Sequence, residues 1–323
     1  MKRHIPAAML IALVTMFVDV TLVFAQSYPT RPVKVVVPFA AGGPLDLVGR
    51  AVSEKLSASL KQPFVMENRT GAGGNIGTEA VAKAAPDGYT LLFVLSGTLT
   101  ANPAMYRKLP FDVEQDFRPI SLLVASSQMV VVHPSLPVNT LAEFVAYAKK
   151  QPVTYAHAGA GSSGHLAMEY FRTMAGFETV QVPYRGNAPL VIDLVAGQVK
   201  AGFVSTVGVI QHVREGRLKG LAISSAARSA LAPNVPTTAE AGYPAFKLET
   251  YFVLLAPAGL PDAIVELLER EVRAVLKAPD LQDKFLAQDI EIVAPTAAEA
   301  RAFLRADTAL WARIAKDANL RVD

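Results

Sequence analysis

The chain has 323 residues, of which 51% are hydrophobic and 18% are charged, a composition that excludes a disordered protein and leaves room for two packed domains. The formal net charge is only +3, so we expect no nucleic-acid partner. The chain has no Cys, and its five His show no H-x-H or H-x-x-x-H spacing, so we expect neither a metal site nor a cofactor.

The N-terminus has the pattern of a secretory signal peptide. A basic start precedes a mostly apolar stretch over residues 5–18, and Val23 and Ala25 supply the small residues that signal peptidase accepts. A membrane anchor is the alternative, but Asp19 interrupts the stretch before the roughly 20 apolar residues that a span requires. We expect cleavage after Ala25, which removes residues 1–25 as a signal peptide and leaves a soluble protein outside the cytoplasm.

Strands and helices alternate through the first half of the mature chain. The β-branched run at 33–37 predicts a strand, and a helix is expected to begin at Pro44, after Gly42 and Gly43. The next expected elements are strand 64–67, a Gly-rich turn at 71–77, helix 75–84 and strand 90–95. Because the strands are apolar throughout, we expect parallel-rich sheets covered by helices on both faces, an α/β fold.

The same alternation restarts after a break at residues 102–117 that is rich in Pro and charge. Thr140 and Glu143 form a capping-box pattern at a helix start. The other expected elements are, in chain order, strand 129–132, strand 153–156, turn 159–164, helix 165–175, strand 180–183, helix 188–196, strand 199–204, helix 207–213, strand 218–224, strand 249–255 and a helical remainder from Pro261 to Lys316.

Two α/β units in an exported chain without an evident catalytic set indicate a two-lobed binding protein with a cleft between the lobes. We expect residues 26–125 and 250–323 to form lobe 1 and residues 126–249 to form lobe 2. Crossing segments near residues 122–130 and 245–254 would then act as the hinge about which the lobes close.

Short sequence blocks run in order along the mature chain. They are Tyr28-Pro29-Thr30-Arg31-Pro32, Val36-Val37-Pro38-Phe39 with Gly42-Gly43 and Asp46, Glu67-Asn68-Arg69 with Gly71-Ala72-Gly73-Gly74, Pro86-Asp87-Gly88-Tyr89, Gly161-Ser162 with His165, Val182-Pro183-Tyr184 with Gly186, Gly197-Gln198-Val199, and Val235-Pro236-Thr237 with Glu240-Ala241-Gly242. This series resembles the Bug family, the periplasmic receptors of tripartite tricarboxylate transporters. The resemblance implies a type II periplasmic-binding-protein (Venus-flytrap) fold that closes on a small organic carboxylate and delivers it to membrane permease subunits. We expect the receptor to be a monomer.

The first candidate site is the loop between the first strand and its helix. Its residues are Phe39, Ala40, Ala41, Gly42 and Gly43. Free N–H groups and the helix dipole favour an anion at such a helix N-terminus. The alternative is that the two Gly only permit a tight turn. Asp46, in the first turn, either caps its own helix, which we favour, or contacts a ligand amino or hydroxyl group.

The turn before helix 165–175 offers the same arrangement from the second lobe. The resemblance implies ligand contacts in this turn, which we assign to Gly159, Gly161, Ser162 and His165, although His165 is equally well explained as a helix-start residue. Further candidates are Tyr184, Arg185 and Gly186 at the end of one strand and Ser96, Thr98 and Ser205 at the ends of others. Arg185 is the one cation that we expect near the mouth of the cleft, as a carboxylate contact or as a solvated loop residue.

The sequence offers three alternative functions, two of them enzymatic. The run Ala160–Gly164 is a loose variant of a nucleophile elbow, so a serine hydrolase using Ser162 is an alternative, but only His212 follows it as a base. The run Gly71–Gly77 resembles a dinucleotide-binding loop without the acidic residue about 20 positions later. We therefore expect no enzyme. A ligand-sensing partner of a signalling protein would have the same sequence features as a transport receptor.

Overall fold

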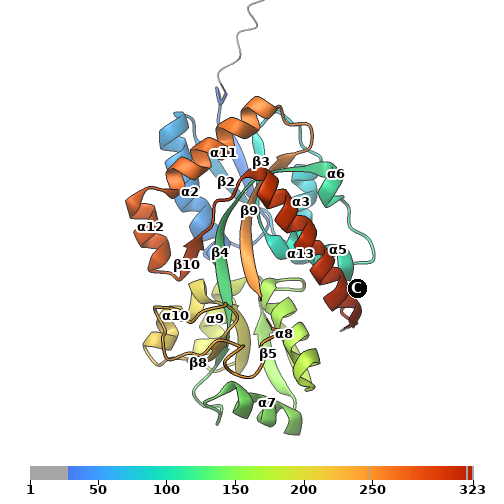
Figure 1. The fold of residues 1–323 in the computed structure, drawn as a ribbon, viewed down its shortest axis with the longest axis vertical. Coiled ribbons are helices and arrows are strands. Elements are labelled where there is room, and N and C mark those ends of the chain that lie inside the picture. Colours follow the sequence, from blue (N-terminus) through green and yellow to red (C-terminus); the bar gives the residue numbers. More distant parts are fainter. Residues whose placement is uncertain (1–27, 247, 318, 322–323) are drawn as a thin grey trace, which may run out of the picture.

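The computed structural model describes residues 28–246, 248–317 and 319–321, so the predicted signal peptide lies outside the described residues. The chain forms two lobes that follow one another along the long axis of the molecule (Figure 1). Each lobe has a central sheet flanked by helices, as the α/β prediction requires.

The upper lobe of Figure 1 contains strands in the order β2-β1-β3-β9-β4, with β10 paired to β4. These strands are β1 (Val33–Val37), β2 (Phe64–Asn68), β3 (Thr90–Leu95), the first part of β4 (Phe117–Val132), β9 (Glu249–Pro257) and β10 (Ile290–Ile292). The helices are α2 (Pro44–Leu60), η2 (Ala72–Gly74), α3 (Asn75–Ala82), α4 (Ser96–Thr100), α5 (Asn102–Met105), α6 (Val113–Asp116), α11 (Asp262–Leu276), α12 (Pro279–Leu286) and α13 (Ala297–Asp317).

The lower lobe continues the sheet in the order β4-β7-β5-β6, with β8 also paired to β4. Its strands are the second part of β4, β5 (Val153–His157), β6 (Thr179–Pro183), β7 (Ala201–Ser205) and β8 (Lys219–Ile223). Its helices are α7 (Leu141–Lys150), α8 (Ser163–Ala175), α9 (Asn187–Val195) and α10 (Thr206–Arg214).

Strand β4 belongs to both sheets and, with β9, links the two lobes. In β4, Ser127 is still paired with Glu249 of β9, whereas the next residue, Gln128, is already paired with Ser205 of β7. Figure 1 shows β4 and β9 running side by side from one lobe to the other. The polypeptide therefore passes between the lobes through extended, paired backbone.

Three sequence expectations need correction. The sheets are mixed, because β4 and β9 run antiparallel to their neighbours while β1–β3 and β5–β7 are parallel within their groups. The expected break at 102–117 contains the short helices α5 and α6, and the strand that follows begins at Phe117 and not at Met129. The C-terminal remainder is not entirely helical, since β10 separates α12 from α13.

Helix α2 illustrates how the sequence positions the site. Pro44 occupies the first turn, where its missing N–H costs nothing, and Leu45, Val48, Val52 and Leu56 recur at helical spacing. All four of these apolar side chains are buried in the core of the upper lobe. This packing fixes the helix against the sheet and holds its N-terminus at the carboxyl end of β1.

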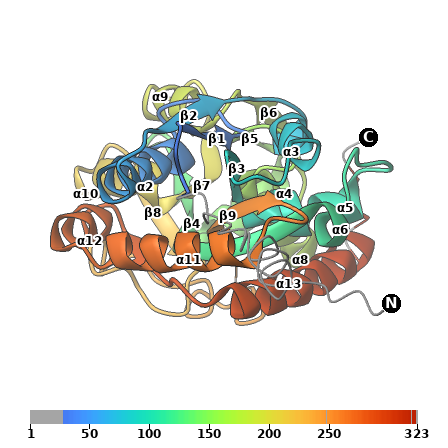
Figure 2. The same ribbon diagram turned by 90° about the horizontal axis from the view of Figure 1, so that it is seen from above.

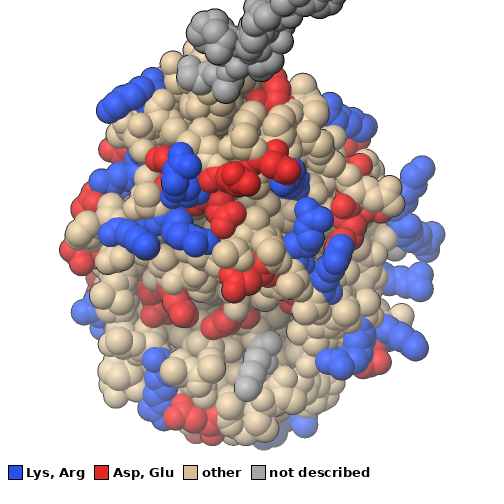
Figure 3. Space-filling model, turned by 45° about the horizontal axis from the view of Figure 1, so that its top comes forward, with Lys and Arg blue, Asp and Glu red and all other residues tan. Residues whose placement is uncertain are grey.

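The surface carries charges of both signs. Figure 3 shows Lys and Arg interspersed with Asp and Glu over the face in view, as the small net charge of the chain suggests. In the described part of the chain, no helix combines the length and apolar character needed to cross a bilayer.

Candidate functional site

A cavity lies between the lobes, beside the two linking strands. It is lined by Phe39, Ala40, Gly43, Pro44, Leu45, Leu95, Gln128, Ala158, Ser162, Ser163, Gly164, Gly186, Asn187, Ser205, Thr250 and Phe252. The upper lobe supplies one wall through the loop that precedes α2. The lower lobe supplies the other wall through the loops that precede α8 and α9 and through the end of β7.

Besides the five-residue α4, whose N-cap Leu95 also lines this cavity, four helices of nine or more residues begin at it. The residues at their N-caps, Gly43 of α2, Ser162 of α8, Gly186 of α9 and Ser205 of α10, all line it. Of these four, only Ser162 caps its helix with its side chain. The first turns of the other helices thus keep backbone N–H groups without a side-chain acceptor, and each helix N-terminus carries about half a positive charge.

Within the part of the chain that the structure describes, no Lys, Arg, His, Asp or Glu lines the cavity. Its polar groups are amides and hydroxyls, of which Gln128 on β4 donates from Nε2 to Thr250 Oγ1 on β9 at 3.2 Å. Both residues are buried. A site of this kind attracts an anion through fixed backbone dipoles and carries no full positive charge to oppose its release.

Six of the predicted site residues line the cavity: Phe39, Ala40, Gly43, Ser162, Gly186 and Ser205. The other predicted residues, Ala41, Gly42, Asp46, Ser96, Thr98, Gly159, Gly161, His165, Tyr184 and Arg185, lie outside its lining. Among the lining residues that sequence reasoning missed, Gln128, Thr250 and Phe252 are on the linking strands, and Asn187 begins α9. The Gly186-Asn187 pair after a strand was a usable helix-start signal for the last of these.

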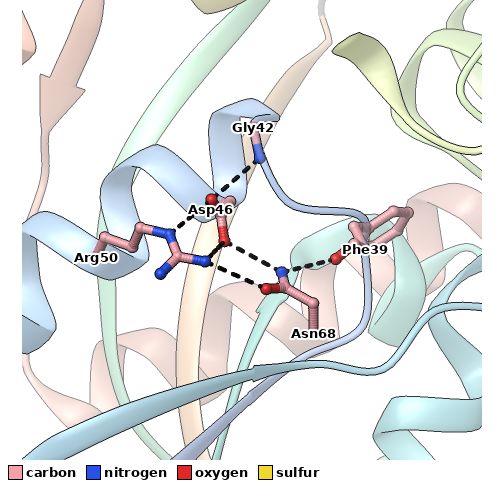
Figure 4. Close-up of polar contacts among 5 residues, drawn as sticks. All are labelled: Phe39, Gly42, Asp46, Arg50 and Asn68. Carbon is pink, nitrogen blue, oxygen red and sulfur yellow. Dashed lines mark hydrogen bonds and ion pairs between the residues drawn. The ribbon is translucent and has the colours of Figure 1, made fainter. Parts of the chain in front are cut away.

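Asp46 is directed onto the loop and not into the cavity (Figure 4). Its Oδ2 accepts hydrogen bonds from the backbone N–H of Gly42 at 3.0 Å and from Arg50 Nε at 2.8 Å. Its Oδ1 accepts from Arg50 Nη2 at 3.0 Å and from Asn68 Nδ2 at 3.1 Å. Asn68 Nδ2 also donates to the carbonyl oxygen of Phe39 at 2.9 Å, so both ends of the loop are held by one network.

The ionisation of Asp46 follows from these contacts. Burial opposes its charge, but the hydrogen bonds from Arg50, Gly42 and Asn68 outweigh burial and lower the pKa of the carboxyl group. Asp46 is therefore a carboxylate at neutral pH, and its hydrogen bonds fix the geometry of the loop.

The loop of the lower lobe is held by a histidine. The backbone N–H of Gly161 donates to His165 Nδ1 at 3.0 Å, and the Ser162 Oγ accepts from the backbone N–H of His165 at 3.4 Å. The His165 ring stacks on His157 with ring centroids 4.5 Å apart. Burial, with a smaller contribution from His157, lowers the pKa of His165 to about 4. The hydrogen bond of Ser162 thus serves the helix cap, which gives no support to a serine nucleophile activated by this ring.

Behind His165, a buried carboxylate anchors α8. Glu169 accepts hydrogen bonds from Tyr155 at 2.8 Å, from Gln181 at 3.0 Å and from Arg172 Nε at 2.8 Å. Burial opposes ionisation, but the Arg172 and Tyr155 hydrogen bonds lower the pKa of Glu169. These contacts fix the helix whose N-terminus faces the cavity.

The remaining predicted residues have structural contacts of their own. Tyr184 donates to Asp193 at 2.7 Å, and Arg185 is exposed. Ser96 directly follows the last residue of β3, as predicted, and begins α4, whereas Thr98 lies inside α4 and not at a strand end. Ser96 Oγ accepts from the backbone N–H of Tyr251, and Thr98 donates to the carbonyl oxygen of Gly73.

Segments of the two lobes approach each other closely at two places. A Cβ added to Gly186 would lie 3.2 Å from Ala40 Cβ. A Cβ added to Gly73 would lie 2.6 Å from the carbonyl oxygen of Ala160. The Gly-rich segment at 71–77 thus meets the loop of the opposite lobe.

In the described residues, no group of three or more His, Cys, Asp or Glu is placed to hold a metal ion.

Comparisons with known proteins agree with this architecture. Residues 48–320 match the family described as tripartite tricarboxylate transporter family receptor. The chain is 36% identical to Protein BugT of Bordetella pertussis over 303 residues, which cover 93% of each protein.

Two solved structures with named ligands have similar folds. The R. palustris protein Rpa4515 with adipate has a TM-score of 0.87 and 34% identity, covering 91% of this chain and 99% of that chain. MatC from Rhodopseudomonas palustris with bound malate has a TM-score of 0.84 and 32% identity, covering 89% of this chain and 99% of that chain. The two-lobed binding-protein fold predicted from the sequence is confirmed.

Proposed function

The chain belongs to the tripartite tricarboxylate transporter receptor family, and on that basis we propose that it captures a small dicarboxylate in the cavity between its lobes. The observation that carries this proposal is the convergence of four helix N-termini on a cavity whose described lining has no ionisable side chain. The ligands named for two structural relatives, adipate and malate, are both dicarboxylates.

The two walls of the cavity suit the two ends of such a ligand. The N-terminus of α2 belongs to the upper lobe, whereas those of α8, α9 and α10 belong to the lower lobe. A dianion that bridges them gains attraction from both walls only when the lobes are together, so binding favours closure. An amino acid would bring an ammonium group to a lining without a carboxylate partner, and we expect it to bind more weakly.

We further propose where the receptor acts and what becomes of its ligand. The chain is a monomer in the periplasm after cleavage behind Ala25, with residues 26–125 and 250–323 in one lobe and residues 126–249 in the other. It releases the dicarboxylate unchanged to the membrane permease subunits of its transporter. Recovery of the ligand from the purified complex, followed by NMR, tests whether it is chemically unaltered.

A thermal-shift series tests the ligand class. Adipate and L-malate are compared with their neutral diamides and with L-aspartate. A ligand present at 100 times its Kd stabilises the folded chain by about 2.7 kcal/mol, which raises the melting temperature measurably. The proposal predicts that at least one diacid raises it while the matching diamide does not. An equal shift with the diamide would show that charge is not what the cavity recognises.

A further inference from the structure

Two buried polar side chains of the ligand cavity have hydrogen-bonding groups that no protein group uses. Gln128 on β4 and Thr250 on β9 both line the cavity and are only 1% and 5% exposed. Gln128 Nε2 donates to Thr250 Oγ1 at 3.2 Å, and among the described residues neither side chain makes a second hydrogen bond. Because a buried polar group is costly when unpaired, this pair favours a polar partner inside the cavity.

The unused groups include both donors and an acceptor. A side-chain amide has two N–H donors and one oxygen acceptor, and a Thr hydroxyl has one donor and two acceptor positions. The bond between Gln128 and Thr250 uses one amide N–H and one acceptor position of the hydroxyl. The amide oxygen, the second amide N–H and the Thr250 O–H are therefore available to a molecule in the cavity.

Backbone contacts fix the position of Gln128. Its N–H donates to Ser224 Oγ at 2.9 Å, and its carbonyl oxygen accepts from the Ser224 N–H at 2.8 Å. Ser224 is itself buried, and its hydroxyl donates to the carbonyl oxygen of Leu248. Gln128 therefore presents its amide from a preorganised position, as a residue that discriminates between ligands must.

The pair lies between the walls that we assign to the two carboxylates. Strands β4 and β9 run from one lobe to the other, and Figure 2 shows them side by side near the centre of the molecule, viewed along its long axis. Gln128 is the first residue of β4 that pairs with β7 of the lower lobe. We expect a dicarboxylate that bridges the helix N-termini of both lobes to pass its carbon chain beside Gln128 and Thr250.

A hydroxyl group on that carbon chain matches the pair. It donates and accepts, so it can donate to Gln128 Oε1 while accepting from the free N–H or from Thr250. If the amide turns over and Thr250 donates to Oε1, the hydroxyl still accepts from the amide N–H. A keto oxygen only accepts, and a further carboxylate would place a full negative charge against the amide oxygen.

The neighbouring lining does not supply the missing partner. Leu95 and Phe252 pair across β3 and β9, and both line the cavity. An unsubstituted methylene chain would pack on these apolar side chains but would leave the free groups of Gln128 and Thr250 unpaired.

We propose that Gln128 and Thr250 select a dicarboxylate with a hydroxyl group on its carbon chain over the same diacid without it. The inference rests on the proposed function, since it takes the cavity as a dicarboxylate site, and it narrows the class of ligand. A site built to hydrogen-bond a ligand hydroxyl rejects the analogue that lacks it, because the buried partners are then left unpaired.

Calorimetry on matched ligands tests this selection. Succinate is compared with L-malate and D-malate, and glutarate is compared with 2-oxoglutarate and with both enantiomers of 2-hydroxyglutarate. For the chain length that binds, we expect one hydroxylated enantiomer to bind at least tenfold tighter than the plain diacid and the keto diacid. A plain diacid that binds as tightly as its hydroxylated counterparts would overturn the inference and leave dicarboxylate capture intact. Absence of binding by every diacid would overturn both.

Two variants assign the preference to the pair. Gln128→Leu and Thr250→Val remove the polar groups with little change in volume, and each should reduce the preference for the hydroxylated diacid to threefold or less. The affinity for the plain diacid should stay within threefold of the wild type. The matched control is Thr238→Val, the same substitution at a buried Thr that donates to the carbonyl oxygen of Phe246 outside the cavity lining.

The control should keep the wild-type preference. An equal loss of affinity for the plain and the hydroxylated diacid in both folded variants would indicate a merely structural role for Gln128 and Thr250 and would overturn the inference. A tenfold preference that survives both substitutions would overturn it as well.

Discussion

The Asp46 carboxylate accepts a hydrogen bond, at 3.0 Å, from the backbone N–H of Gly42, which lies four residues earlier in the chain. This contact places a negative charge against the loop that borders the cavity while keeping it out of the cavity lining. Asp46 therefore shapes the anion site without repelling the anion directly. The sequence left open whether Asp46 caps its helix or contacts the ligand. The observed contacts with Gly42, Arg50 and Asn68 favour a structural role at the start of its own helix.

The first prediction concerns this loop contact. Asp46→Asn keeps an oxygen acceptor for Gly42 and should leave diacid affinity, measured by calorimetry, within about threefold of the wild type. Asp46→Ala removes the acceptor that Gly42, Arg50 and Asn68 share, so it should weaken binding tenfold or more, a cost of about 1.4 kcal/mol or above. A tenfold loss in Asp46→Asn would instead indicate that the charge contacts a cationic group of the ligand.

The second prediction is a pH dependence of stability. Burial lowers the pKa of His165 to about 4, whereas an unfolded His titrates near 6.5. The unfolded chain therefore binds more protons between these values, so the stability from the neutral ring is present above about pH 6.5 and is lost as the pH falls towards 4. This difference in the pKa of His165 between the folded and the unfolded chain corresponds to roughly 3 kcal/mol of unfolding free energy.

His165→Gln keeps an acceptor for the Gly161 N–H and does not titrate. Urea unfolding at a series of pH values should give a shallower loss of stability between pH 6.5 and 4 for this variant than for the wild type. His133→Gln, at the surface of the same lobe, is the control and should keep the wild-type slope. Identical slopes in all three proteins would exclude His165 as the group responsible.

The third prediction uses a glycine at the lobe contact. A Cβ on Gly73 would lie 2.6 Å from the Ala160 carbonyl oxygen, so Gly73→Ala should hold the lobes apart and weaken diacid binding at least tenfold. Gly176→Ala is the matched control, because Gly176 has a similar positive φ of +70° against +63° but no atom within 4 Å of an added Cβ. Both substitutions place an Ala at a positive φ, so the two variants have the same kind of backbone strain.

Calorimetry measures the diacid affinities of the two variants, and small-angle scattering measures their radii of gyration. Gly73→Ala with saturating diacid should keep a larger radius of gyration than the wild type, and Gly176→Ala should match the wild type. Equal losses of affinity in the two variants would attribute the effect to backbone strain and not to the lobe contact.

Local sequence patterns predicted the parts of the site that depend on local structure. Gly43-Pro44 after a β-branched run marked the start of α2, and the Gly-rich turn before His165 marked the start of α8. Each signal is contained in a few neighbouring residues, because helix caps and tight turns are decided by local backbone chemistry.

The missed residues depend on contacts between distant segments. Gln128 and Thr250 lie 122 positions apart in the sequence and come together because β4 pairs with β9. No local sequence pattern around either residue predicts that pairing. Strand β10 was missed because it has only three residues between two helices and pairs with the distant Ser126. The mixed sheets have the same origin, since strand direction is set by tertiary pairing and not by composition.

The most direct test of dicarboxylate capture is a crystal structure of the receptor with the diacid that gives the largest thermal shift. We expect one carboxylate at the N-terminus of α2 and the other at those of α8 and α9. Their oxygens should lie within 3.2 Å of backbone N–H groups and should have no Lys, Arg or His partner. A ligand carboxylate paired with Arg185, or a ligand bound outside the cavity between the lobes, would contradict this expectation.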